Sequence, residues 1–599
     1  MSNLFSVPNL TNKASRSGFD LSKKNSFTAK IGELLPVMHR SMMPGDKAKL
    51  SIQHRTVTLP LETSAFTRFT EYFDFFFVPY DQLYRQAPQV LTQMQNNPTI
   101  AASSSSAVPI GQNLPWMRLS DFVTLNKNAS SGAPYLMTLY NGGYVADTPT
   151  QQAKQVNYQG FNLGYEALKL YNYLGGAYVP ETYFDSYTGK DTTSNPRIPS
   201  PRPYSLLPWA AYQKIYFDFY RFQQWENNSP QCYNFDYLPS TAFLSLTEMR
   251  KMDPQSNLFT LRHCNYPKDL FFGMLPSPQY GDTATVNVLY DPTDIKSDTF
   301  NVYSEPTTGM EIVTPQGDAE SSLGEGDSSA IAIGINMLQL RQAKALQRYR
   351  EVIGTGNQDY KSMIKKLYDV DVPEYTVHLV KYLGGFRSEI TIDAVVNQNL
   401  ADVNSKPNMT GVASAIDDQG KPIEFDCKEH GILMCIYRIL PIIDYALCSP
   451  DFDLLKTEVD DFANPMFDRL GLQELPSLYL NDVNNNPSSY VADADQTIGY
   501  VPRYYDYKTS IDVVNGGFRT QLSHWLSALT PDFIDAWLPK KDGSFQINKD
   551  FFKVNAHLCD SIFFENVTQS VDTDPFLVNC NIDFKCVRNL DYRGLPTNN

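Results

Sequence analysis

The sequence predicts a mainly β fold, a sandwich of strands that carries large loop insertions and a few helices. Three features lead to this prediction: short segments rich in β-branched and aromatic residues recur along the chain, long turn-rich tracts separate them, and few stretches have a helical period. The chain has 599 residues, of which 42% are hydrophobic and 19% charged, so it can bury a large core. It shows no internal repeat of fixed period.

Residues 1–49 are polar, and their charge is opposite to that of the whole chain. Eight lysines and arginines stand against three acidic residues, a net charge of +5, whereas the whole chain has a formal net charge of −15. The acidic total excludes nucleic-acid binding over the whole surface, so any such contact needs a local basic patch. We predict an extended basic N-terminal arm over 1–49; a solvated terminus without a partner is the alternative.

Strand signals begin after this segment. In KLSIQHRTVTLPL, Leu50 and Ile52 share one face of a strand and Val57 and Leu59 share the other, which predicts a β-bulge between the two pairs. In FTRFTEYFDFFFVPY, aromatic residues occupy both faces, which indicates a strand that is covered on both sides and ends at Pro79. Further strands are predicted in EYTVHLVKYL, FRSEITIDAVV, HGILMCIYRIL and FLVNCNIDFKCV.

Two tracts between the strand signals are rich in turn-forming and small residues. The longer spans about 86–205 and includes QNNPTIAASSSSAVPIGQN and DSYTGKDTTSNPRIPSPRP; the shorter spans about 283–330 and ends in SSLGEGDSSA. Loops of this length in a compact protein are usually functional or disordered. We therefore predict two surface insertions in one domain that runs from 50 to 599.

The segment LLPWAAYQKIYFDFYR predicts an aromatic helix. Four of its rings lie at i, i+3, i+7 and i+11, which is one helical face, and a fifth widens that face. These residues are Trp209, Tyr212, Tyr216, Phe217 and Tyr220. A helix with so many rings lies either in the core of its own subunit or where subunits meet, since aromatic residues are enriched in interface cores. We name the five as candidate subunit-interface residues and keep burial in the core as the alternative.

The stretch INMLQLRQAKALQRYREVI predicts a second helix. Asn336 and Gln339 fit a capping box at its start. Its apolar face consists of Ile335, Leu338, Ala345, Leu346, Tyr349 and Ile353. Its opposite face is basic and consists of Arg341, Lys344, Arg348 and Arg350.

The search for catalytic and metal-binding patterns identifies no site. G-x-S-x-G and H-E-x-x-H motifs are absent, and the seven histidines are spread over the chain. Two weak metal patterns are better interpreted as buried core thiols and as a polar Asn-rich turn. The first is Cys427, His430, Cys435 and Cys448; the second is Asp482, Asn484, Asn486 and Asp493. We therefore predict no enzyme activity, no bound metal and no cofactor.

Two other classes of protein remain as alternatives. The many tyrosines would suit a secreted β-rich carbohydrate-binding protein, but the N-terminal sequence has no apolar segment of a secretory signal, and no stretch predicts a membrane helix. The eight cysteines lack a paired framework and are interpreted as reduced, mostly buried thiols. A hydrolase with paired carboxylates is the second alternative, although Asp451 with Asp453, or Asp460 with Asp461, are better interpreted as solvated loop charges.

Several segments, in their order along the chain, resemble the major capsid proteins of the Microviridae, the small single-stranded DNA bacteriophages. They are LLPWAAYQKIYFDFYR, KDLFFGMLPSPQYGD, INMLQLRQAKALQRYREVIGTGNQDY, EYTVHLVKYLGGF, EHG before a strand, GYVPRYYDYKTSIDVVNGGFR and LSHWL. The resemblance extends over about 30–60 and 200–590, and gokushoviruses and gut-associated members are the most similar groups. The first insertion is longer and the second shorter than in gokushoviruses, so we expect 86–205 to form the protrusion at the threefold axes, with a contribution from 283–330.

The resemblance implies a single viral jelly roll, an eight-stranded antiparallel β-sandwich with insertions. It also implies that the chain assembles with itself into a small T=1 icosahedral shell around a circular single-stranded DNA genome, in virions assembled in the cytoplasm of the bacterial host. Other expected partners are a host-cell receptor, contacted by surface loops, and other virion proteins such as pilot and small DNA-binding proteins. The residues expected to face the DNA are Lys13, Arg16, Lys23, Lys24, Lys30, Lys585, Arg588 and Arg593.

Overall fold

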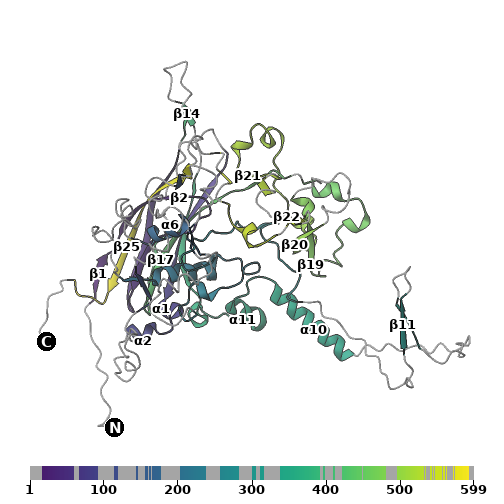
Figure 1. The fold of residues 1–599 in the computed structure, drawn as a ribbon, viewed down its shortest axis with the longest axis horizontal. Helices are drawn as coiled ribbons and strands as arrows, with labels where there is room; N and C mark the ends of the chain where they lie inside the picture. Colours follow the sequence, from purple (N-terminus) through teal and green to yellow (C-terminus); the bar gives the residue numbers. More distant parts are fainter. Residues whose placement is uncertain are drawn as a thin grey trace, which may run out of the picture.

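A β-sandwich occupies one side of the molecule, and helices and irregular segments extend from it on the other (Figure 1). This is a computed structural model. It describes residues 16–59, 66–91, 114–118, 144–145, 156–158, 161–163, 165–176, 203–237, 256–281, 300–304, 311–315, 337–390, 395–397, 409–411, 421–447, 449–480, 496–531, 533–534, 540–541, 544–545, 547–555, 558–559, 562, 571–572 and 574–592.

Two antiparallel sheets form the centre of the fold. Sheet I has the strand order β2-β25-β4-β16, with β1 paired to the other end of β25, and sheet II has the order β3-β17-β5-β13. Sheet I consists of β1 (Ser17–Asp20), β2 (Lys23–Ala29), β4 (Lys47–Thr58), β16 (Ile423–Asp426) and β25 (Phe576–Arg588). Sheet II consists of β3 (Leu35–Met42), β5 (Phe69–Pro79), β13 (Lys381–Ile390) and β17 (Gly431–Pro441).

The path of the chain through these strands is that of a jelly roll. From β2 to β5 the chain alternates between sheets I and II, and from β13 to β25 it alternates between them again. Two four-stranded sheets connected in this way contain two Greek keys. The eight-stranded antiparallel sandwich expected from the sequence is therefore confirmed.

Two connections contain most of the remaining chain. One runs from 80 to 380 between β5 and β13, and the other runs from 442 to 575 between β17 and β25. Both predicted insertions, 86–205 and 283–330, lie within the first connection, and most of each falls outside the described residues. The second connection was not predicted, because aromatic and aliphatic residues are spread through it as they are in sandwich strands.

The first connection contains two regions of helix that cover or extend from the sandwich. Its elements are α1 (Tyr80–Leu83), α2 (Ala87–Leu91), β6 (Trp116–Arg118), β7 (Tyr144–Val145), β8 (Val156–Tyr158), β9 (Phe161–Leu163), α6 (Tyr165–Tyr173), β10 (Pro203–Ser205), α8 (Leu207–Ile215), η1 (Tyr216–Tyr220), η2 (Pro230–Cys232), β11 (Phe300–Ser304), β12 (Glu311–Pro315), α10 (Met337–Gly354), α11 (Tyr360–Tyr368) and η4 (Glu374–Val377). The two predicted helices are confirmed as α8 with its π-helical continuation η1, and as α10. None of the helices in the described ranges is long and apolar enough to cross a membrane.

The other connections contain short strands and single 3₁₀ turns. Between β13 and β16 lie β14 (Val395–Asn397) and β15 (Met409–Gly411). The second long connection contains β18 (Asp444–Tyr445), η5 (Phe452–Leu455), η6 (Val459–Asp461), β19 (Leu472–Pro476), η7 (Ser477–Tyr479), β20 (Thr497–Pro502), α12 (Tyr505–Lys508), η8 (Gly516–Arg519), η9 (Ser523–Trp525), β21 (Ala528–Leu529), β22 (Lys540–Lys541), β23 (Ser544–Phe545), η10 (Lys549–Phe552) and β24 (Val571–Asp572).

The described part of the predicted N-terminal arm is not an arm. Residues 17–42 form β1, β2 and β3, and β4 begins at Lys47, so most of 16–49 belongs to the two sheets. Alternating burial along β2 and β4 explains why the segment is polar: every second side chain faces water while its neighbours fill the core. The first fifteen residues lie outside the described ranges.

The bulge predicted in β4 is absent. The register of β4 against β25 runs without a shift from Lys47 to Thr58. After Ile52, the inward positions are occupied by the polar residues His54 and Thr56, whose side chains bind the buried Glu71 carboxylate of β5 at 2.7 and 2.6 Å. The prediction was wrong because the strand keeps its alternation after Ile52, but its inward positions there are polar. These polar side chains form a network between the two sheets.

Candidate functional surfaces

The aromatic helix α8–η1 lies against sheet II. Tyr212 donates its hydroxyl to the carbonyl of Leu34, just before β3, and accepts from the backbone N–H of Arg262, both at 2.8 Å. Tyr220 donates to Asp74 on β5 at 2.8 Å. Each ring therefore buries its apolar surface while its hydroxyl keeps a hydrogen bond, as buried tyrosines require.

All five residues expected at a subunit interface are buried within one chain. Trp209, Tyr212, Tyr216, Phe217 and Tyr220 are between 1% and 7% exposed. Burial raises the pKa of Tyr216 and Tyr220 well above the usual value, and the adjacent carboxylates of Glu226 and Asp74 act in the same direction. This burial favours the core interpretation of the helix, since the rings already have partners in their own subunit. The ring of this segment that remains accessible is Phe219, which is 45% exposed.

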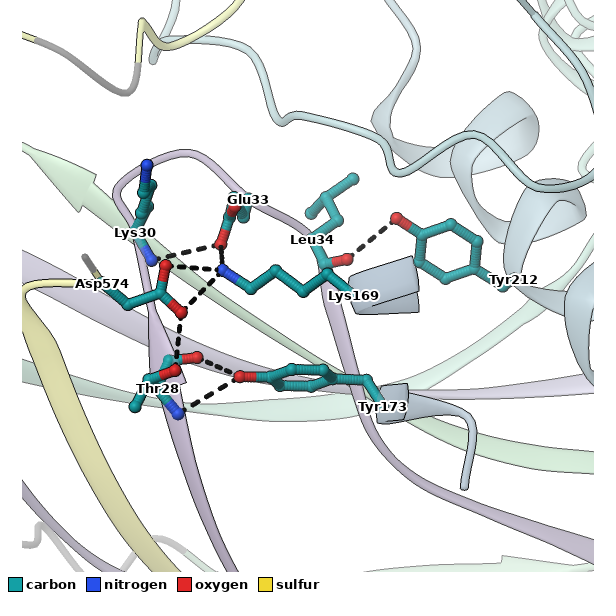
Figure 2. A network of polar contacts seen from close by, with 8 residues as sticks. All are labelled: Thr28, Lys30, Glu33, Leu34, Lys169, Tyr173, Tyr212 and Asp574. Atoms are coloured by element: carbon teal, nitrogen blue, oxygen red, sulfur yellow. Dashed lines mark hydrogen bonds and ion pairs between the residues drawn. The ribbon is translucent and has the colours of Figure 1, made fainter. Parts of the chain in front are cut away.

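A buried ion network fixes α6 to the sandwich (Figure 2). The Lys169 ammonium lies 2.5 Å from Glu33 and 2.8 Å from Asp574, and the three side chains are between 1% and 5% exposed. Glu33 also accepts from the backbone N–H of Lys30, and Asp574 accepts from the hydroxyl of Thr28 at 2.6 Å. The network connects the first long connection to β2, to the turn after it and to the start of β25.

Two further contacts hold the end of α6. The Tyr173 hydroxyl donates to the backbone carbonyl of Thr28 and accepts from its N–H, and burial raises the pKa of Tyr173 to about 12. An imidazole nitrogen of His39, on β3, lies 3.0 Å from the carbonyl oxygen of Leu174. Burial lowers the pKa of His39, so the neutral ring donates this hydrogen bond. The helix thus packs on β3 of sheet II and is also tied to β2 and to the segment just before β25 in sheet I.

Sheet I, by contrast, presents a polar outer face to water. Along β25 exposed and buried side chains alternate from end to end. At one end of the sheet, outward charges pair across strands: Lys47 with Asp426 at 3.5 Å and Lys49 with Glu424 at 3.5 Å. An open depression at this end is lined by such side chains, so its charge is nearly balanced.

The residues expected to face DNA are in different surroundings. Lys23 and Lys24 are exposed on β2, and Lys585 is exposed on β25 with Asp583 at 3.4 Å. Lys30 is only 8% exposed, which excludes its side chain from an open genome-facing surface in this conformation.

Two of the expected arginines have partners in the described part of the chain. The Arg588 side chain is 17% exposed and lies 3.1 Å from Asp46, and Arg16 donates to the side chain of Asn589 at 2.7 Å. Lys13 and Arg593 lie outside the described residues. Among the named residues that the structure describes, the accessible positive charge is therefore at Arg16, Lys23 and Lys24, with Lys585 partly neutralised.

Two exposed surfaces were not identified as sites from the sequence. On α10, Leu340, Leu346 and Tyr349 are 42–48% exposed, so two residues of the predicted apolar face, Leu346 and Tyr349, remain accessible in the chain. In the segment 451–470, six large apolar side chains are 48–88% exposed: Leu454, Val459, Phe462, Met466, Phe467 and Leu470. The segment has neither helical nor strand periodicity, so its apolar residues gave no signal of exposure.

The described cysteines are poorly suited to nucleophilic or metal chemistry. Burial raises the pKa of Cys264 to about 11 and that of Cys427 and Cys580 to about 12, so these thiols stay protonated near neutral pH. Among the residues that the structure describes, no three histidine, cysteine, aspartate or glutamate side chains are grouped closely enough to hold a metal ion. Cys448 of the weak zinc pattern and the whole weak calcium pattern lie outside those residues.

Comparison with known proteins places these surfaces in context. The family model described as capsid protein (F protein) matches residues 8–112 and 176–597. Capsid protein VP1 of Bdellovibrio phage phiMH2K is 22% identical over 353 residues, which cover 54% of this chain and 61% of that protein. Capsid protein VP1 of Chlamydia phage 1 is 21% identical over 301 residues, which cover 48% of each protein. The chain thus spans about half to three fifths of the length of these relatives.

Proposed function

The chain belongs to the capsid protein (F protein) family of the Microviridae, and from this premise we propose that it forms a T=1 icosahedral shell around a circular single-stranded DNA genome. The observation that carries the proposal is the extent of the family match, which includes all the strands of both sheets and the second long connection. The chemistry agrees, because the described surface offers exposed apolar and charged faces for contacts between copies in place of a cleft with catalytic groups.

Genome contact in this proposal comes from local positive charge on a chain that is acidic overall. Lys23 and Lys24 are the accessible cations on β2, and backbone phosphates would be bound by such ammonium groups without base specificity. Replacing both with alanine should lower the DNA packaged per particle. Lys47→Ala is the matched control, since its ammonium already pairs with Asp426. Equal packaging in the double variant and the wild type would remove these two residues from the genome-facing surface.

The remaining parts of the proposal concern the outside of the particle. Loops of the tracts 86–205 and 283–330 would contact a receptor on the host cell, because long surface loops tolerate variation and commonly carry recognition. Assembly would take place in the bacterial cytoplasm, with pilot and small DNA-binding proteins as further virion components. A deletion within 86–205 that leaves particles intact but abolishes adsorption to the host would support the receptor role.

Microscopy of the purified protein tests the central claim. Negative-stain images of protein produced with the other virion proteins should show uniform icosahedral particles, and nuclease-treated fractions should retain protected single-stranded DNA. A monodisperse monomer that binds glycans in a simple binding assay would instead support a carbohydrate-binding protein. Uniform particles without protected DNA would support shell assembly but contradict the proposed enclosure of a DNA genome.

A further inference from the structure

Two exposed surfaces of the protomer combine apolar side chains with opposite net charge. Helix α10 carries four arginine or lysine residues and one glutamate, a net charge of +3. The segment 451–470, called here the acidic segment, carries six carboxylates and two cations, a net charge of −4. The two surfaces are complementary in charge, and both leave large apolar side chains in water.

Among the described residues, helix α10 is anchored at its C-terminal end. Arg341, Lys344 and Arg348 lie at i, i+3 and i+7, so they form one exposed stripe. Around the helix, Tyr349 lies between this stripe and Leu346, which is on the opposite face. The helix extends away from the sandwich (Figure 1). Helices of this length are marginal without a packed face, so an uncovered apolar face indicates a partner outside the protomer.

The C-terminal turn of α10 anchors the helix. Ile353 is buried, the carbonyl of Arg350 accepts from the N–H of Tyr280 at 3.3 Å, and Gln347 hydrogen-bonds Gln279. The anchored turn fixes the direction of the helix and leaves the basic stripe free of ion pairs with the described residues. A neighbouring surface can therefore bind the stripe without first displacing a carboxylate of the described residues.

The acidic segment is held in a defined shape although its apolar side chains are exposed. One carboxylate oxygen of Asp461 accepts from the backbone N–H groups of Thr457 and Glu458, both at 2.7 Å, and these bonds lower the pKa of Asp461. Its base is packed: the ring of Phe452 contacts Tyr479 at 5.1 Å. A surface that is already ordered loses little conformational entropy when it binds.

We propose that α10 of one copy docks against the acidic segment of a neighbouring copy of this chain. The contact would bury Tyr349 against the apolar residues of the segment, with the neighbouring basic stripe facing its carboxylates. Like charge disfavours a contact of α10 with α10, or of the segment with itself, so the interface joins two different surfaces. An interface of this kind builds closed rings or shells when its rotation closes. The inference rests on the proposed function, since it assigns a contact within the shell.

Charge reversal and rescue test the pairing. Arg341→Glu with Arg348→Glu places acidic side chains on both sides of the contact and should lower particle yield at least tenfold. Asp453→Lys with Glu458→Lys should do the same from the other side, and combining all four changes should restore particles. Arg341→Lys with Arg348→Lys keeps the charge and is the matched control. Because Arg341 and Arg348 are exposed and make no ion pair with the described residues, the thermal midpoint of the unassembled α10 variant should stay within about two degrees of wild type. Asp453→Lys also breaks an ion pair with Lys456 at 2.8 Å, so the segment variant is judged by the rescue.

The apolar half of the contact has its own matched variants. Val459 and Met466 are 88% and 84% exposed, so changing both to aspartate should leave the protomer folded and prevent assembly. Val459→Ile with Met466→Leu keeps the apolar surface and should assemble normally. Equal assembly of the aspartate and the apolar variants would show that the segment stays in water in the particle, which would overturn the inference.

Zero-length carbodiimide cross-linking separates the inference from the proposed function. In particles made from a mixture of unlabelled and ¹⁵N-labelled protein, Lys344 should link to Asp453 or Glu458 between differently labelled chains. If the wild type forms no icosahedral particles, the proposed function fails, and the same cross-link still reports whether α10 binds the segment. The inference is overturned if wild-type particles lack this cross-link. It is also overturned if the charge-reversal variants assemble normally, or if combining them does not restore particles. If charge reversal on α10 gives intact shells that contain no DNA, the helix contacts the genome and not a neighbouring copy, and the inference is overturned as well.

Discussion

Sheets I and II are joined in one sandwich, but the outer face of sheet I is open to water, whereas the two central strands of sheet II are covered on theirs. In β4 and β25 of sheet I, exposed and buried side chains alternate, whereas β5 and β17 of sheet II are buried on both faces along almost their whole length. The cover of sheet II comes from the first long connection, through α6 and α8. Sheet I is thus open to solvent or to a partner, whereas sheet II packs against helices of the first long connection and forms a second hydrophobic core with them.

The difference determines what a polar residue needs on each outer face. Asp74 on β5 is 4% exposed and binds Tyr220 at 2.8 Å and Arg438 at 3.2 Å. On sheet I, Lys49 and Glu424 lie 3.5 Å apart with more than half of each side chain in water. A buried charge must be paired because desolvation is expensive, but an exposed one can rely on water.

The largest expected effect comes from breaking the cover of sheet II at Lys169. Lys169→Met removes the ammonium that lies between Glu33 and Asp574 and leaves two buried carboxylates side by side. The free energy of unfolding should fall by about 3–5 kcal/mol, the usual cost of an uncompensated buried charge. Urea unfolding of the unassembled chain measures the change.

A triple variant makes that measurement specific. Lys169→Met combined with Glu33→Gln and Asp574→Asn should recover part of the loss, because no carboxylate is then left unpaired. A single variant as stable as the wild type would show that α6 does not need the ion network to cover sheet II.

Substitutions at outward positions of the two sheets should differ in their effect on stability, with a large loss on sheet II and a negligible one on sheet I. Phe76 on β5 is fully buried and contacts Tyr220 and Tyr382, with ring centroids 5.8 and 5.4 Å away. Phe76→Ala should cost about 3 kcal/mol through lost burial and the cavity left behind. Gln53→Ala, at an exposed outward position of β4, should change stability by less than about 0.5 kcal/mol. Similar losses at both positions, compared by urea unfolding, would mean that sheet I is also covered in the unassembled chain.

The structure of sheet II was easier to predict from the sequence than the structure of sheet I and of the N-terminal segment that joins it. Aromatic residues on both faces of FTRFTEYFDFFFVPY indicated a covered strand, and β5 confirms it. The N-terminal segment was interpreted as an arm because it is polar and carries a net charge of +5, whereas many of its polar side chains are the outward half of strands. Composition alone cannot separate these two cases, because an inward residue such as Phe27 stands between polar residues that point outward.

The candidate site was less predictable than the fold for a related reason. Ring spacing placed Trp209 and Tyr216 on one helical face correctly, but the same pattern serves a core and an interface, and only the position of sheet II shows which surface the rings meet. Buried polar partners such as Lys169 and Asp574 are 405 residues apart in sequence, so no local pattern relates them. The exposed apolar residues of 451–470 could not be separated from core residues, since exposure depends on tertiary contacts.

Acid should loosen the cover of sheet II at His39. The pKa of this imidazole is lowered by burial, so the folded chain binds the proton less readily than the unfolded chain does. The stability that the neutral ring contributes is fully present above the unfolded pKa of about 6.5, and it is lost as the pH falls from there through the folded pKa. The thermal midpoint should therefore fall more steeply with acid in the wild type than in His39→Gln. Parallel curves between pH 7 and 5 would exclude His39 as the titrating group.

The smallest effect is expected where charges already lie in water, at the outer face of sheet I. Lys49→Ala removes one partner of an ion pair whose side chains are 56% and 74% exposed, so the unassembled chain should lose less than about 1 kcal/mol, and less still at high salt. A double-mutant cycle with Glu424→Ala isolates the pair energy. A coupling of 2 kcal/mol or more would require that this end of sheet I be shielded from solvent. The two sheets would then differ in what covers their outer faces and not in whether these faces are exposed. A coupling near zero in the unassembled chain that becomes large for particle stability would instead place this face of sheet I in a contact made on assembly.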